Sequence, residues 1–125
     1  MKPQTLARQA YAQASAPTRT PRDAEYEVIS RITYRLKTAA AQRDIDFGGF
    51  AAALHENRRL WTVLAAGVAD AENRLPVDLR ARIFYLAEFT RQHSSRVLGG
   101  KAPVEPLLDI NTAVLRGLRQ AGSVA

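Results

Sequence analysis

The fold of this chain is decided by the stretch Leu54-His55-Glu56-Asn57-Arg58-Arg59-Leu60-Trp61, which holds the only tryptophan among 125 residues. It lies inside a longer pattern whose apolar positions are three or four residues apart, namely Phe50, Leu54, Asn57, Trp61, Leu64 and Val68. That spacing places these side chains on one face of an α-helix. Asn57 stands in the middle of the face, and a buried amide there must find a hydrogen-bond partner or cost stability.

Start and stop signals place four helices along the chain. The first begins at Thr20 and Pro21 and runs to about residue 42. The second, which contains Trp61, is expected over about 47–71 after a cap at Asp44 or Asp46. The third covers about 76–98, with Gly99 as a C-cap, and the fourth runs from Leu107 to about Gln120. We therefore predict an all-α fold, a small antiparallel bundle of four main helices over residues 20–121, with residues 1–19 as a basic N-terminal arm or short helix.

Two further apolar faces also carry one polar side chain each. His93 interrupts the third helix, whose other inward residues are Leu79, Ile83, Leu86, Phe89 and Val97. Asn111 interrupts the fourth, whose inward residues are Leu107, Leu108, Val114, Leu115 and Leu118. Because antiparallel neighbours bring Asn57, His93 and Asn111 to similar heights, we predict one structural polar layer that fixes helix register, beside Trp61 as the core anchor.

The alternative reading of this layer is a metal or catalytic site. One histidine and two amides make a poor metal set, and no nucleophile or second base accompanies them. The chain has no cysteine, so thiol chemistry and disulfides are excluded. We expect no enzyme activity and no catalytic, metal or cofactor residues.

The net charge of +6 and the pI near 10.3 permit contact with nucleic acid or an acidic partner. Residues 1–22 contain no acid, whereas later arginines are scattered among acids on helix faces, which is typical of a solvated surface. Direct nucleic-acid binding therefore stays open but is not favoured. No apolar run is long enough to cross a bilayer and the N-terminus lacks a signal-peptide core, so we expect a cytoplasmic protein without membrane insertion.

Phe84 and Tyr85 fall outside the inward stripe of the third helix, and Phe84 shares its face with Arg80 and Arg91. An apolar ring flanked by cations suits a partner surface. We take these four residues as candidate partner-binding residues, with Tyr11 and Leu6 as a second wall. The alternative is that the N-terminal segment or the first helix covers this face.

At these positions the chain resembles the flagellar biosynthesis regulator FlaF family of alphaproteobacteria, over roughly residues 9–118. The most specific segments are Asn57-Arg58-Arg59-Leu60-Trp61, Leu75-Pro76 with Leu79-Arg80-Ala81 and Phe89…His93, and Pro106-Leu107-Leu108-Asp109-Ile110-Asn111. Ala10-Tyr11 and Pro21-Arg22…Glu25 also fit, whereas Gly48-Gly49 and the tail after Leu118 match less well.

The resemblance implies a non-enzymatic protein that binds flagellin and supports its synthesis and secretion as an export chaperone. It also implies a companion regulator, FlbT, that acts on flagellin mRNA. The alternative function is post-transcriptional control of flagellin expression together with that companion. No catalytic residue, metal or cofactor comes with the resemblance.

Overall fold

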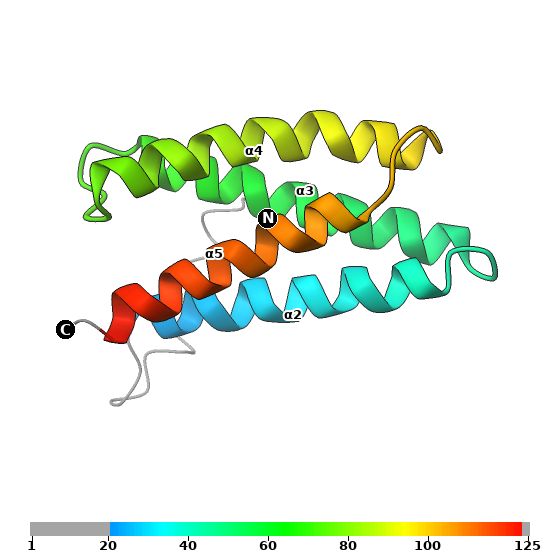
Figure 1. The fold of residues 1–125 in the computed structure, drawn as a ribbon, viewed down its shortest axis with the longest axis horizontal. Helices are drawn as coiled ribbons and strands as arrows, with labels where there is room; N and C mark the ends of the chain where they lie inside the picture. Colours follow the sequence, from blue (N-terminus) through cyan, green and yellow to red (C-terminus); the bar gives the residue numbers. More distant parts are fainter. Residues whose placement is uncertain (1–20, 124–125) are drawn as a thin grey trace, which may run out of the picture.

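The computed structural model describes residues 21–123, which form four α-helices and no strand (Figure 1). The helices are α2 (Pro21–Ala41), α3 (Phe47–Ala69), α4 (Val77–Leu98) and α5 (Glu105–Ser123). The prediction of a small all-α bundle of four main helices is confirmed. The predicted arm, residues 1–19, lies outside the described residues.

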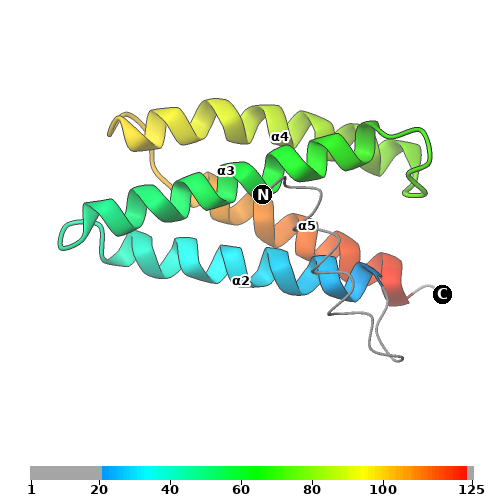
Figure 2. The ribbon, with the colours of Figure 1, turned by 180° about the vertical axis from the view of Figure 1, so that it is seen from behind.

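Consecutive helices run antiparallel, and α3 lies between α2 and α4 (Figures 1 and 2). The last helix, α5, packs mainly along α2 and approaches α4 much less. Two apolar clusters fill the interior. One lies around Trp61, Ile29 and Ile83, and the other around Phe50, Leu36 and Leu107.

Capping residues explain where α3 begins and where α4 ends. Asp46 is the N-cap of α3, and its Oδ1 accepts a hydrogen bond of 2.9 Å from the backbone N–H of Gly49. A Cβ at Gly49 would lie 2.4 Å from Asp46 Oδ2, so glycine lets the carboxylate close on the helix end. Gly99 is the C-cap of α4, but the left-handed residue is Gly100, with φ of 72°.

The α4 end forms a Schellman motif. Gly100 N–H donates to Val97 O at 3.0 Å, and Lys101 N–H donates to Arg96 O at 2.8 Å. The last helix begins at Glu105, two residues earlier than expected, because Pro106 is tolerated in a first helical turn where its missing N–H is not needed.

The inward face of α4 differs from the predicted stripe. Leu79 and Leu86 are only half-buried and Phe89 is 36% exposed. The buried positions are instead Ile83, Ala87, Thr90, His93, Ser94 and Val97. Small side chains on this face let the α4 backbone approach α3 closely, which rotates the larger leucines toward the edges.

The Schellman glycine gives a stability prediction. Gly100→Ala should cost about 1 kcal/mol, because a Cβ is disfavoured at positive φ. Gly99→Ala is the matched control. Gly99 has φ of −79° and its added Cβ would meet Ser95 O at an ordinary 3.5 Å. We expect it to change stability by less than about 0.5 kcal/mol in urea unfolding. Equal effects of the two substitutions would contradict this account of the α4 end.

Candidate functional site

Asn111 is the centre of a buried hydrogen-bond network that joins three helices. Its Oδ1 accepts from Trp61 Nε1 at 2.8 Å. Its Nδ2 donates to Asn57 Oδ1 at 2.8 Å and to Thr33 Oγ1 at 3.0 Å. The Thr33 hydroxyl in turn donates to Ile29 O at 2.6 Å. The network ties α5 to α3 and α2 inside the core, since Asn57 and Asn111 are fully buried and Trp61 is 1% exposed.

The structure brings together Asn57 and Asn111 but places His93 elsewhere. The Nε2 of His93 is 2.8 Å from Pro103 O, and a carbonyl can only accept, so this nitrogen carries the proton. The imidazole also stacks on Phe89, with ring centroids 5.1 Å apart. The three-residue layer is therefore corrected: His93 fastens the α4–α5 connection, because matching height along a helix does not fix the direction of a side chain.

Thr33 is the network member that sequence reasoning missed. It lies four residues after Ile29 and three before Leu36, which places it on the inward line of α2. That spacing was a usable signal. A threonine on the buried face of a helix is a candidate partner for a buried amide from a neighbouring helix.

The network is structural in character. Its members are amides, a hydroxyl and an indole, and none of these groups is a good base or metal ligand. Among residues 21–123, no group of three or more aspartates, glutamates and histidines is arranged to hold a metal ion.

A surface groove lies between α3 and α4, with a volume of about 220 Å³. Four residues of each helix line it, namely Arg58, Trp61, Thr62, Ala65, Phe84, Ala87, Glu88 and Arg91. Trp61 and Ala87 are buried and form an apolar floor, whereas Phe84 is 55% exposed on one wall. The groove therefore combines a fixed aromatic floor with an accessible aromatic side chain.

Charged side chains stand on both walls of this groove. Arg91 Nη2 donates to Glu88 Oε1 at 2.5 Å, and this hydrogen bond together with the arginine charge holds the pKa of Glu88 below its ordinary value. Both side chains are more than half exposed, so the pair adds little stability. Arg58 faces them from α3.

Arg80 is half-buried on α4, one turn before Phe84. Its Nε is inaccessible to solvent and has no hydrogen-bond partner in the described part of the chain. Two arginines and one glutamate thus line the groove, and Arg80 lies one turn before Phe84 on the same helix.

Only some of the candidate partner-binding residues line the groove. Phe84 and Arg91 line the groove, whereas Arg80 does not line it and lies one helical turn before Phe84 on α4. Tyr85 is 70% exposed but does not line the groove, because the next residue along a helix points about 100° away. Tyr11 and Leu6 lie outside the described residues. Trp61, predicted as a core anchor, is also part of the groove floor.

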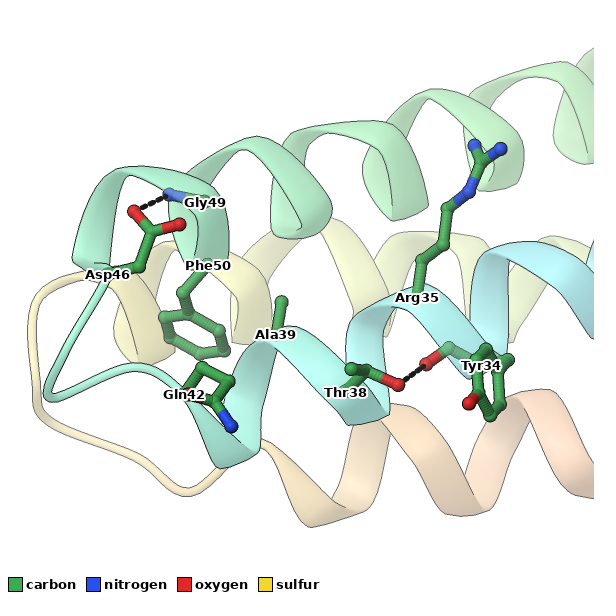
Figure 3. Close-up of a pocket in the computed structure, with 8 residues that line it drawn as sticks. All are labelled: Tyr34, Arg35, Thr38, Ala39, Gln42, Asp46, Gly49 and Phe50. Atoms are coloured by element: carbon green, nitrogen blue, oxygen red, sulfur yellow. Dashed lines mark hydrogen bonds between the residues drawn. The ribbon is translucent and has the colours of Figure 1, made fainter.

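A second groove, between α2 and α3, was not anticipated from the sequence. It has a volume of about 270 Å³ and is shown in Figure 3. Its lining residues are Tyr34, Arg35, Thr38, Ala39, Gln42, Asp46, Gly49 and Phe50. Arg35 is held by Glu56 at 2.9 Å, and Phe50 is fully buried. The polar groups of Arg35, Thr38 and Asp46 in this groove are thus already hydrogen-bonded within the bundle.

The fold and its grooves define a small all-α helical-bundle protein. Over residues 21–123, no helix is both long enough and apolar enough to cross a membrane. The family model described as flagellar protein FlaF matches residues 7–118, and the chain belongs to this family. No curated protein and no solved structure matches the chain.

The buried network predicts a large effect of Asn111→Ala. This change leaves the Trp61 indole N–H and the Asn57 carbonyl oxygen without their partner and opens a small cavity, so it should cost at least about 3 kcal/mol. The control is Thr112→Ala, one residue away and exposed, which should cost less than about 0.5 kcal/mol. Urea unfolding measures both. A small effect of Asn111→Ala would show that the network does not hold the bundle together.

Proposed function

We propose that this FlaF-family protein binds flagellin in the cytoplasm and supports its synthesis and secretion as an export chaperone, without catalysing a reaction. Membership of a flagellar protein family supports the choice of partner. The observation that carries the proposal is the α3–α4 groove, in which an accessible phenyl ring stands above a buried apolar floor.

Flagellin is a partner whose shape suits such a groove. Its terminal segments are amphipathic helices that stay disordered until they assemble into the filament. An amphipathic helix laid in an apolar groove buries the face that would otherwise polymerise. Binding by this protein would thus keep flagellin monomeric and fit for export.

We expect a few side chains to contribute most of the binding free energy. Rings that become fully desolvated at the centre of an interface carry most of its free energy, and charged residues at the rim add specificity. Phe84 is the ring that we expect to become desolvated, and Arg58 and Arg91 are the charged residues at the rim.

Phe84→Ala tests the proposal directly. It should weaken flagellin binding at least tenfold, because it removes the exposed ring from the groove wall. Tyr85→Ala is the matched control, since Tyr85 is a neighbouring exposed ring outside the groove, and it should change affinity less than twofold. Titration calorimetry with purified flagellin measures both, and unfolding curves verify that both variants stay folded.

The salt dependence of binding distinguishes flagellin binding from the alternative function, in which this protein controls flagellin mRNA alone or with the companion regulator FlbT. Contacts to many phosphates would weaken steeply between low and moderate ionic strength, whereas binding in an apolar groove with a few charges at its rim would weaken much less. If Phe84→Ala and Tyr85→Ala bind flagellin equally well, the groove is not the flagellin site. If the protein binds flagellin mRNA with steep salt dependence but does not bind flagellin, the chaperone function is wrong.

A further inference from the structure

Two arginines of α4, Arg91 in the α3–α4 groove and Arg80 one turn before Phe84, have a spacing that indicates which kind of helix would fit the groove. Arg80 and Arg91 are eleven residues apart on α4, which is three helical turns. Eleven residues at 100° each end 20° from the starting direction, so both arginines lie on the same side of α4. Phe84 lies between them on that side, one turn from Arg80 and two turns from Arg91.

Each of these arginines has hydrogen-bonding capacity left for a partner. Arg80 is half-buried, and its side chain has no hydrogen bond or ion pair within the described residues; because its Nε is sealed from solvent, a partner would meet the terminal nitrogens of the guanidinium. Arg91 contacts Glu88 through one Nη2 bond, while a guanidinium carries five N–H donors. Arg58 lines the opposite wall and is half-buried. Since Glu88 is the one acid in the groove lining, the groove has a positive balance.

Resting on the proposed function, we infer that this groove selects an acidic amphipathic helix whose carboxylates lie eleven residues apart and bracket an apolar anchor. One carboxylate meets Arg80, and the other meets Arg91 and Arg58. The anchor lies against Phe84 over the floor formed by Trp61 and Ala87. Because Phe84 is closer to Arg80 than to Arg91, an anchor placed off-centre between the two carboxylates also sets the direction of the bound helix.

Charge complementarity favours this ligand over two other possible occupants of the groove, which are the N-terminal segment of the same chain and a second copy of the protein. Residues 1–22 carry Lys2, Arg8, Arg19 and Arg22 and no acid, so that segment repels an arginine rim. A second copy would bring the same groove, and two like-charged rims oppose self-association. The ligand class is therefore a separate, acidic amphipathic helix.

Designed peptides test the pattern without any assumption about flagellin. The probe is an alanine–leucine helix of about 18 residues with two glutamates eleven positions apart. The first comparison peptide has the same composition with the glutamates nine positions apart, on opposite faces. The second has lysines in place of the glutamates. The only tryptophan, Trp61, lies in the groove floor, so its fluorescence reports binding of peptides that lack tryptophan.

The eleven-position peptide should bind at least about tenfold more tightly than either comparison peptide. Arg80→Gln and Arg91→Gln should each remove most of this preference. The control for both is Arg82→Gln, an exposed arginine of the same helix that does not line the groove. Arg58→Gln should also reduce the preference, and its control is Arg59→Gln, the exposed neighbour on α3.

Several outcomes would overturn the inference. Equal binding of the two glutamate peptides would leave only non-specific charge attraction. Tighter binding of the lysine peptide would point to a basic segment, such as residues 1–22, as the occupant. Self-association in sedimentation that Phe84→Ala abolishes would make the groove an interface between copies.

Measurements of flagellin binding distinguish a failure of this inference from a failure of the proposed function. Flagellin binding that depends on Phe84 but is unaffected by Arg80→Gln and Arg91→Gln would retain the proposed function and overturn the charge pattern. Discrimination between the peptides in a protein that does not bind flagellin would retain the pattern and overturn the chaperone function.

Discussion

The hydrogen bonds of Asn111 are the constraint on which the rest of the bundle depends. One amide satisfies three partners, an indole on α3, an amide on α3 and a hydroxyl on α2. Each partner is buried or half-buried, so a shift of α5 by one residue would leave several polar groups without partners and without water. Apolar packing alone tolerates such shifts more readily, because it is not directional. The network therefore selects one register among those that the leucines would allow.

This core constraint reaches the surface through Trp61. The indole N–H is held on the interior side by Asn111, while the same side chain contributes to the floor of the α3–α4 groove. Its orientation is consequently fixed before any partner arrives, and a surface that is already ordered loses less entropy on binding. The walls differ from the floor, because Phe84 and Arg91 are exposed side chains that can change rotamer to suit an incoming helix.

The sequence predicted the four helices because capping residues and periodic apolar positions are local signals. Asp46 and the Gly99-Gly100 pair mark helix ends whatever the tertiary contacts are. The common height of Asn57 and Asn111 followed from matching each of them to the third helix, which is antiparallel to both of its neighbours in the chain. The partner of His93 did not, since Pro103 O becomes available only where the connection folds back on α4. The inward face of α4 was also misjudged, because periodicity weighs large apolar residues while close helix approach favours small ones such as Ala87 and Ser94.

That close approach gives the α3–α4 seam a different character from the rest of the bundle. Side-chain hydrogen bonds join α3 to α2 and α5, but within residues 21–123 none joins α3 to α4. Thr90 Oγ1, Ser94 Oγ and Asn57 Nδ2 are buried there or nearby without partners, and each such group costs about 1–3 kcal/mol. Extensive apolar contact between α3 and α4 offsets this cost but fixes no direction. A groove at this seam thus has one wall on α3, which side-chain hydrogen bonds join to α2 and α5. Its other wall is on α4, which contacts α3 through packing alone, and this is the wall that can adjust to a partner.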